Sequence, residues 1–401
     1  MLHFIDQTSV GNHHMVFNAS MVQVLLRIYP NEPITLYGIS SNQKSMSEFF
    51  TKTDLERISF KEIVYPSPRI ENIIFKALNY FQKEIVRKKM FRKLLSSCEV
   101  TDLVFLSITT FTSFSYFVKL KIKYKVPTLA CLHGDIDFLY NAQNKYEKVN
   151  GNVHKKLMKI NLSNFKFVLL NKIAKPILLK DGYLSSANVV DIEHPFTDLK
   201  RTRLRNKLTN NPIKLAHIGS MEVKRKNSHF IYSLAQQLDL LINEKYIELQ
   251  TIGLITPLVL PFKNSLVKEI VGNEESDKPK YLSRTDYEIA LEQVHYTLFF
   301  YPEIEYVFRA SGATVDTIAF EKPIFTLKHP YFEYLFRVAG NVGYMFDDLV
   351  AMQLKIKEIA NNPTIFEKEY NIQCENLKTF KETLTIDSIA QDLLKQIEKL
   401  R

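Results

Sequence analysis

Cysteine is scarce in this sequence, and the few cysteines form no pattern. The chain has 401 residues and three cysteines, Cys98, Cys131 and Cys374. A disulfide framework needs many cysteines in a short chain, and a Cys-based zinc site needs closely paired ones. The scattered positions therefore argue against both, and the sequence predicts no metal site.

Long hydrophobic runs are also missing. The longest charge-free apolar stretch, residues 103–118, contains six Ser and Thr residues. It falls short of the roughly 20 mostly apolar residues that span a bilayer. The N-terminus, Met-Leu-His-Phe-Ile-Asp, has no basic segment and does not resemble a secretory signal. We therefore expect a cytoplasmic location, with peripheral contact to the inner face of the cell membrane as the one membrane association left open.

Glycine is sparse, with 11 in the chain, so each glycine is expected to mark a place where the backbone requires it. No glycine-rich linker, low-complexity tract or internal repeat is evident. Apolar residues make up 46% and charged residues 24%, which is typical of a soluble globular protein, and the length favours two domains. Lys and Arg together number 53 against 43 Asp and Glu, so the net charge is +10.

Strand-like and helix-like segments alternate along the chain, which indicates parallel strands joined by crossover helices. The expected strands are 2–6, 34–39, 103–107, 128–132 and 165–170 in the first half, and 213–218, 247–252, 296–301 and 324–327 in the second. The expected helices of the second half are 227–242, 284–294, 311–320 and 347–360. The predicted fold class is therefore α/β, with two Rossmann-like doubly wound domains facing across a cleft.

The domain boundaries follow from this alternation and from one polar, basic stretch. We expect an N-terminal domain over 1–197 and a linker over 198–211. A C-terminal domain then covers 212–380. The remaining segment, 381–401, is expected to be a helix that packs back on the first domain. Ligands of such sheets bind at the carboxyl ends of the strands.

The segment richest in candidate site residues follows the strand 296–301. Arg309, Ser311 and Gly312 stand at the start of a predicted helix, and a helix N-terminus suits a phosphate group. Arg309 adds a bidentate charge contact, and the carboxylate of Asp316 is placed to accept hydrogen bonds from ribose hydroxyls. A purely structural interpretation stays open, in which Ser311 caps the helix and Asp316 complements its dipole.

The run Arg-Ala-Ser-Gly-(x)3-Asp-(x)2-Ala-Phe-(x)-Lys-Pro-Ile, residues 309–324, resembles the donor-site segment of GT-B glycosyltransferases. It is most similar to the family-4-like, or group 1, enzymes that use nucleotide sugars. In those enzymes a Glu-(x)7-Glu motif lies here. The resemblance gives Asp316 the place of the second glutamate, which holds the ribose, and Phe308 the place of the first. Glu305 or Glu303 would then supply the first acidic role from a shifted position.

The start of the second domain also fits this resemblance. Gly219 ends a predicted strand and allows close approach by a phosphate, while Lys224 and Lys226 neutralise its charge. In the family, a Gly-Arg after the strand and a later Lys-Gly contact the diphosphate. Gly219 and Lys226 match that pattern, whereas Ser220 and Asn227 replace the other two residues. A basic loop that faces water is the alternative. Leu282 would lie near the nucleotide base.

In the first domain, His133 and Asp135 follow the predicted strand 128–132. The resemblance implies that a histidine here faces the transferred sugar or its phosphate. Asp135 or Asp137 would be the general base of an inverting mechanism, although helix capping is the interpretation that we favour for both.

The first loop contains Gly11, Asn12, His13 and His14. In the resembling enzymes such a loop lines the cleft near the acceptor, so Asn12 and His13 are candidate acceptor contacts. Ordinary exposed loop histidines are the alternative. No spaced metal-binding partner and no Asp-x-Asp motif accompany these residues, which favours a metal-independent enzyme.

Basic residues gather in the first half, above all in 69–93, where eight Lys and Arg residues face two Glu residues. With interleaved Ile, Leu and Phe, this segment suits an interfacial helix on anionic lipid. A crossover helix with a solvated basic face stays open as well. A second basic cluster consists of Lys119, Lys121, Lys123 and Lys125. No helix-turn-helix, zinc-finger or RNA-recognition signature is apparent, so nucleic acid is not an expected partner.

The resemblance to GT-B glycosyltransferases, together with these features, implies a glycosyltransferase of the hexosyltransferase class that needs no cofactor. In it the N-terminal domain would bind the acceptor and the C-terminal domain the nucleotide sugar. The enzyme would move a sugar from a nucleotide-diphosphate sugar to a saccharide or lipid-linked saccharide acceptor, during bacterial surface polysaccharide synthesis. A nucleotide-sugar 2-epimerase of the same fold is one alternative. A non-catalytic nucleotide-sugar-binding protein is another. The donor sugar, the acceptor, the linkage and the stereochemical outcome do not follow from the sequence.

Overall fold

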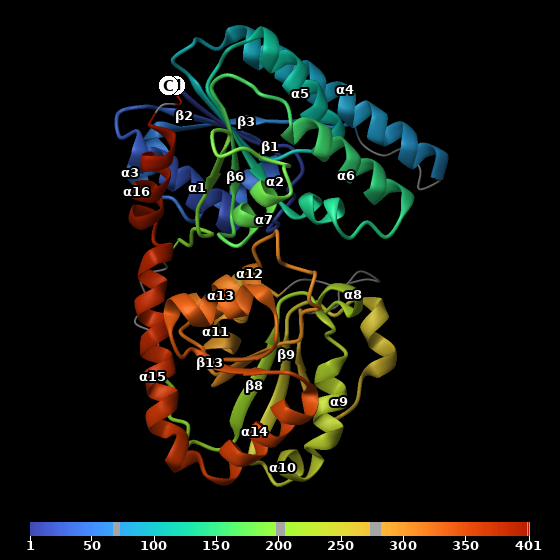
Figure 1. Ribbon diagram of the computed structural model, residues 1–401, viewed down its shortest axis with the longest axis vertical. Helices are drawn as coiled ribbons and strands as arrows, with labels where there is room; N and C mark the ends of the chain where they lie inside the picture. Colours follow the sequence, from blue (N-terminus) through green and yellow to red (C-terminus); the bar gives the residue numbers. More distant parts are fainter. Residues whose placement is uncertain (67–72, 198–204, 273–281, 399, 401) are drawn as a thin grey trace. The chain divides into compact units, whose positions relative to one another are not determined.

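The computed structural model describes residues 1–66, 73–197, 205–272, 282–398 and 400. The chain forms two compact units. Met1–Thr197 and Leu384–Arg401 make the N-terminal unit, and Asp198–Thr383 makes the C-terminal unit. Each unit contains one parallel sheet with helices on both faces (Figure 1).

The N-terminal sheet has seven parallel strands in the order β3-β2-β1-β4-β5-β6-β7. Its strands are β1 (Leu2–Asp6), β2 (Ile34–Gly38), β3 (Ile58–Glu62), β4 (Leu103–Ile108), β5 (Thr128–Leu132), β6 (Phe165–Leu169) and β7 (Val189–Asp191). The central strands are covered on both faces, so their sequences are apolar runs in which polar and apolar residues do not alternate. The rings of Phe4 and Phe105 stack across β1 and β4 with centroids 5.2 Å apart.

Helices flank this sheet on both sides. They are α1 (Met15–Ile28), α2 (Ser40–Ser47), α3 (Lys52–Arg57), α4 (Ile73–Ser97), α5 (Phe111–Lys123), α6 (Lys145–Met158), α7 (Ala174–Lys180) and α16 (Ile386–Ile397), with the 3₁₀ turn η1 (Gly134–Leu139). In Figure 1, α4, α5 and α6 lie together on one face. The last helix, α16, packs against α1, where Arg27 and Asp387 form an ion pair of 2.7 Å.

The C-terminal sheet has six parallel strands in the order β10-β9-β8-β11-β12-β13. Its strands are β8 (Ile213–Ile218), β9 (Ile247–Ile252), β10 (Val267–Ile270), β11 (Tyr296–Phe299), β12 (Ile324–Leu327) and β13 (Gly343–Phe346). Its helices are α8 (Val223–Lys226), α9 (Phe230–Gln237), α10 (Asp239–Asn243), α11 (Arg284–Glu292), α12 (Gly312–Ala319), α13 (Pro330–Ala339), α14 (Leu349–Asn361) and α15 (Pro363–Lys381), with the 3₁₀ turn η2 (Pro257–Phe262). The turn η3 (Glu382–Leu384) follows α15.

The strand order of each sheet locates its ligand-binding edge. In the N-terminal unit the order reverses between β1 and β4, and in the C-terminal unit it reverses between β8 and β11. At such a point the two flanking crossovers leave on opposite faces and open a crevice at the carboxyl ends of the strands. The loops after β1, β8 and β11 are therefore the expected places for bound ligand.

The predicted fold class is confirmed as α/β with two doubly wound sheets, but one predicted helix is wrong. The expected helix over residues 227–242 is two separate helices, α9 and α10, and the short helix α8 precedes them. Asn227 adopts a left-handed backbone with φ of +48° and ends α8, and Leu238 interrupts the helix again. Asparagine tolerates the left-handed region better than most residues, which explains why the chain turns there.

Two residues of the expected basic surface are buried instead of solvated. Arg87 in α4 is 6% exposed and donates to Glu84 over 2.6 Å. Lys121 in α5 is 2% exposed and donates to the carbonyl of Ser163 over 2.9 Å. These cations hold the N-terminal unit together and are not part of its surface charge. Within the described part of the chain, no helix is long and apolar enough to cross a membrane.

Candidate functional site

Two glycines touch at the carboxyl ends of β8 and β9. Gly219 has φ of +89° and Gly253 has φ of +132°, both in the region that favours glycine. A Cβ atom on Gly253 would lie 2.2 Å from the carbonyl oxygen of Gly219. This contact requires glycine at position 253 and fixes the backbone that follows β8.

The side chain of Lys226 lies directly over Gly219. Its Nζ is 3.2 Å from the point where a Cβ atom on Gly219 would sit. Lys226 is only 6% exposed, and burial lowers the pKa of its ammonium group to about 8 while Glu222 acts in the opposite direction. A buried cation beside a side-chain-free backbone is arranged to receive an anion.

The loop that carries Lys226 is held by a buried histidine. His217, in β8, contacts the carbonyl of Leu298 through Nδ1 and the hydroxyl of Ser228 through Nε2, each over 2.8 Å. The backbone N–H of Glu222 donates to the same hydroxyl over 2.9 Å. Burial lowers the pKa of His217 to about 3, so the ring stays neutral. The loop is therefore fixed before any ligand arrives.

The N-terminus of α12 meets the same point. The Cβ atom of Ala313 lies 3.5 Å from the position of a Cβ on Gly219. Ser311 caps the helix by accepting from the N–H of Thr314, and it shares a hydrogen bond of 2.7 Å with the hydroxyl of Tyr301. Among the described residues, the N–H groups of Gly312 and Ala313 have no acceptor. The fold of the C-terminal unit therefore brings Gly219, Lys226 and the start of α12 to one place.

Arg309 lies next to the same loops. Its guanidinium is 5.6 Å from the ring centroid of Tyr306 and 3.7 Å from a carboxylate oxygen of Glu305. Tyr306 is buried, which raises the pKa of its hydroxyl, and both Arg309 and Arg225 act to lower it. The arginine of the β11–α12 segment and the arginine of α8 thus approach one tyrosine.

Asp316 is tied to α11. Arg284 donates to it over 2.9 Å and to Glu288 over 2.7 Å. Tyr287 is buried beside this pair, and burial, with Asp316 next in effect, raises the pKa of its hydroxyl well above the usual range. Asp316 therefore has a structural partner in α11, while 15% of its side chain remains exposed.

In the N-terminal unit, the loop after β1 is held at both ends. Asp6 accepts from the N–H groups of Thr8 and Ser9, at 2.9 and 3.0 Å. Asn42, in α2, donates to the carbonyls of Gly11 and His13 over 2.7 and 2.8 Å. Asn12 and His13 are exposed on this loop, and Asn12 accepts from Ser45 over 3.0 Å.

His133 lies against this loop at the end of β5. Its ring centroid is 5.3 Å from that of His14 and 5.1 Å from that of Phe17. Burial lowers the pKa of His133 to about 3 and that of His14 to about 2, so both rings are neutral near pH 7. Nε2 of His133 is buried and has no hydrogen-bond partner within the described residues.

No protein-family model and no curated protein matches this sequence. Solved structures do match along the whole chain. HepE from Anabaena, in complex with UDP-glucose, has a TM-score of 0.65 and 11% identity, with 99% of each chain covered. A glycosyltransferase from Rickettsia africae has a TM-score of 0.60 and 14% identity, with 100% of this chain and 97% of that chain covered. WaaG, a glycosyltransferase involved in lipopolysaccharide biosynthesis, has a TM-score of 0.60 and 10% identity, with 100% of both chains covered.

This chain has the GT-B fold. The likeness spans both units, and it confirms the resemblance that the motif around residues 309–324 suggests. Identities of 10–14% show the fold alone, so substrate and reaction need arguments from this chain's own residues.

Four further residues were predicted as site residues: Ser220, Lys224, Leu282 and Asp135. Ser220 follows Gly219 and is half-buried, whereas Lys224 is exposed on the short helix α8. Leu282 is half-buried and immediately precedes Ser283, which caps α11. Asp135 stands in the turn η1, and its side chain lies outside the described residues.

Several residues that shape the GT-B site were not singled out from sequence. Gly253 matters only because its backbone contacts that of Gly219. The two glycines follow β9 and β8, so they are distant along the chain and adjacent in the fold. His217 lies inside an apolar strand and Arg284 at the start of a helix, and neither carries a motif. The scarcity of glycine was a usable signal for Gly253, since it follows a predicted strand just as Gly219 does.

Proposed function

We propose that the protein is a glycosyltransferase of the hexosyltransferase class that uses a nucleotide-diphosphate sugar as donor. The observation that carries this proposal is the convergence of Lys226, Gly219 and the N-terminus of α12 at the carboxyl edge of the C-terminal sheet. A buried ammonium, free backbone N–H groups and space without a side chain together suit a diphosphate.

The chemistry follows from that charge arrangement. As the bond between the sugar's anomeric carbon and the β-phosphate oxygen breaks, negative charge grows on the departing diphosphate. We assign Lys226, Arg309 and the α12 N-terminus to the stabilisation of this charge, which would favour the transition state over the ground state. These groups supply positive charge from the chain itself, so we propose transfer without a metal.

The acceptor hydroxyl must pass its proton to a base as its oxygen bonds to the anomeric carbon, and we propose the carboxylate of Asp135 or Asp137 as that base. His133, Asp135 and Glu305 are our candidates for contacts at the reacting centre. Burial keeps the His133 ring neutral, so it acts as a hydrogen-bonding group and holds no charge of its own. We assign Asp316 to the ribose and Leu282 to the base, with Asn12 and His13 on the acceptor side.

We further propose that the acceptor is a saccharide, or a lipid-linked saccharide, of a bacterial surface polysaccharide. WaaG, which shares the fold, takes part in lipopolysaccharide biosynthesis. Support from this chain itself comes from α4. Leu78, Phe81 and Ile85 on this helix are 50%, 64% and 52% exposed, which is unusual for such large apolar side chains.

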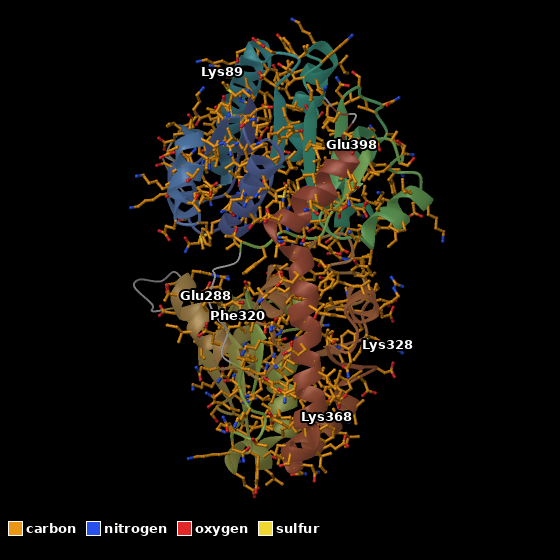
Figure 2. The ribbon with its side chains drawn as sticks, turned by 90° about the vertical axis from the view of Figure 1, so that its left-hand side faces the viewer. Lys89, Glu288, Phe320, Lys328, Lys368 and Glu398 are labelled. Carbon is orange, nitrogen blue, oxygen red and sulfur yellow. The ribbon has the colours of Figure 1, made fainter. Side chains whose placement is uncertain are left out.

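Five exposed residues of α4 lie along one face of the helix and form what we call the α4 stripe. Spacings of three and four residues place Leu78, Phe81 and Ile85 on the face that continues through Lys88 and Arg92. Lys89 lies beside it, on the outside of the N-terminal unit (Figure 2). An apolar stretch that passes into a basic one along a single face suits the surface of an anionic membrane, where a lipid-linked acceptor would be found.

The function is tested by incubating the protein with a panel of nucleotide sugars and following thermal stability and release of nucleoside diphosphate. We expect one donor to raise the melting temperature and to release diphosphate when a glycan acceptor is added. Arg309→Ala should reduce kcat/KM by at least about tenfold, the loss expected when a charge contact to the leaving group is removed.

Arg337→Ala is the matched control, because its guanidinium lies 5.8 Å from the ring of Tyr334 in the same kind of contact but on α13. Interconversion of the donor sugar without an acceptor would replace the proposal by an epimerase. Binding without turnover would replace it by a nucleotide-sugar-binding protein.

A further inference from the structure

A buried histidine, His3, lies close to a cysteine and an aspartate in the N-terminal unit. It stands in β1, near the amino-terminal edge of the N-terminal sheet, and is 6% exposed. Both Nδ1 and Nε2 lack a hydrogen-bond partner among the described residues. Leaving a buried polar group without a hydrogen-bond partner destabilises the fold, so such a group calls for a missing partner.

Two further side chains with metal-binding atoms face His3. Cys98 follows the end of α4 and is half-buried, and Asp102 immediately precedes β4. One ring nitrogen of His3, the thiol sulfur of Cys98 and one carboxylate oxygen of Asp102 lie within 4.8 Å of one another. Imidazole, thiolate and carboxylate are the three ligand types that zinc takes in proteins.

The carboxylate is oriented in advance. The N–H of Glu99 donates to Oδ2 of Asp102 over 2.9 Å, and the amino group of Met1 donates to Oδ1 over 2.9 Å. Oδ2 lies 3.7 Å from Nε2 of His3, which is too long for a hydrogen bond. It is nevertheless close to the separation of about 3.3–3.8 Å that two ligands on one tetrahedral zinc ion adopt.

We propose that His3, Cys98 and Asp102 bind one Zn²⁺ ion, with a solvent molecule as fourth ligand. On binding, the Cys98 thiol gives its proton to solvent and a sulfur–zinc bond forms, without oxidation or reduction. The ligand atoms close on the ion by about 1 Å, which a half-buried cysteine permits. The neutral imidazole supplies a lone pair and keeps its proton on the other nitrogen.

The location gives the ion a structural role. His3 begins the chain's first strand, whereas Cys98 and Asp102 flank the turn between α4 and β4, about a hundred residues later. The zinc ion joins these segments at the edge of the sheet opposite to the loops that follow β1 and β5. Its occupancy stabilises the N-terminal unit by mass action and leaves donor binding in the C-terminal unit unchanged.

The expectation of no metal site rested on the spacing of residues along the chain. In the folded sheet, residues that are far apart along the chain become neighbours in space. Parallel pairing sets β1 beside β4, with His3 opposite Val104. The metal ligands are thereby neighbours in space although no sequence motif unites them.

Cobalt(II) is the direct probe, because a cobalt–thiolate bond gives a charge-transfer absorption band and a tetrahedral site gives visible d–d bands. Metal-free full-length protein should take up one Co²⁺ with both features, and one equivalent of Zn²⁺ should remove them. Cys98→Ser should abolish the charge-transfer band and weaken Zn²⁺ binding more than about tenfold.

Cys131→Ser is the control, since Cys131 also belongs to the N-terminal unit but to β5, and it should keep the band. His3→Gln should lose metal uptake as well, with circular dichroism as the check that it folds. A wild-type protein that shows no thiolate band, or a band that persists in Cys98→Ser, overturns the proposal. Neither result bears on the nucleotide-sugar site, which is measured separately by UDP binding.

Discussion

The Nζ atom of Lys226 lies 3.2 Å from the place that a Cβ atom on Gly219 would occupy. A glycine with φ of +89° and a lysine with 6% exposure thus define one small space. A Cβ atom at position 219 would crowd that space and push the ammonium group aside by a few tenths of an ångström. The donor site therefore depends on the absence of a side chain as much as on the presence of a charge.

Gly219→Ala should abolish this space and strain the backbone. We expect UDP affinity to fall more than tenfold and the free energy of unfolding to fall by about 1–2 kcal/mol, the cost of a left-handed backbone for an L-residue. Gly182→Ala is the matched control, because φ there is +66° and a Cβ would meet nothing within 4 Å. It should lose similar stability and leave UDP affinity intact, as calorimetry and thermal unfolding would show.

Lys226→Met should have opposite effects on stability and on binding. Burial lowers the pKa of Lys226 from 10.5 to about 8, so at neutral pH the folded protein holds a costly buried charge. Removing it should stabilise the unliganded protein by up to about 3 kcal/mol while UDP binding is lost. Lys224→Met, exposed on the same short helix, should change neither quantity.

The same pKa predicts a pH dependence for the wild-type protein. The unfolded state binds more protons than the folded state between about pH 8 and 10.5, so stability should rise with pH across that window. UDP binding requires the protonated amine and should weaken as pH rises above about 8. An affinity that stays constant to pH 9.5 would remove Lys226 from the phosphate contacts.

Asp316→Asn separates a ribose contact from a structural ion pair. If Asp316 binds the ribose, the variant should lose the preference of the wild-type protein for UDP over 2′,3′-dideoxy-UDP. Glu288→Gln also weakens a partner of Arg284, at 2.7 Å, but leaves Asp316 in place and should keep that preference. An Asp316→Asn variant that only loses stability would confine this residue to the ion pair.

The α4 stripe makes membrane binding testable with two independent variants. Lys88→Glu with Lys89→Glu should reduce sedimentation with vesicles rich in anionic lipid several-fold, and Phe81→Ser with Ile85→Ser should do so without changing charge. Lys145→Glu with Lys148→Glu is the control, since both lysines are exposed on α6 of the same unit. Equal sedimentation of all variants would reject the membrane surface. Arg87 is left unchanged because it is buried against Glu84.

The strand positions followed from the sequence because buried parallel strands must be apolar on both faces. Strands such as β1, β4 and β8 are short apolar runs, and their expected ranges match the structure closely. The four strands at the sheet edges, β3, β7, β10 and β13, were missed. β3 is exposed along most of its length, and the other three have only three or four residues. The prediction of the fold class thus depended on the central strands, whose apolar runs are the clearest pattern in the sequence.

Side-chain exposure could not be predicted as reliably as strand position. Eight basic residues in one segment suggested a uniformly solvated face, yet Arg87 pairs with Glu84 inside the unit. Glu84 lies one helical turn before it, and Thr110, which reaches the same carboxylate over 2.8 Å, comes from another segment. A charged or polar side chain can be buried when hydrogen-bond partners surround it. Partners that come from other segments have no fixed spacing along the chain.

The sequence by itself determined the two alternating α/β halves, the cap at Ser311 and the glycine that ends β8, because these depend on local backbone preferences and on apolar patterning. Only the tertiary structure decided that Gly253 presses on Gly219, that Ala313 meets them, and that His3 faces Cys98 and Asp102. Strand pairing brings such residues together across separations of tens of residues or more, and no local preference encodes that proximity.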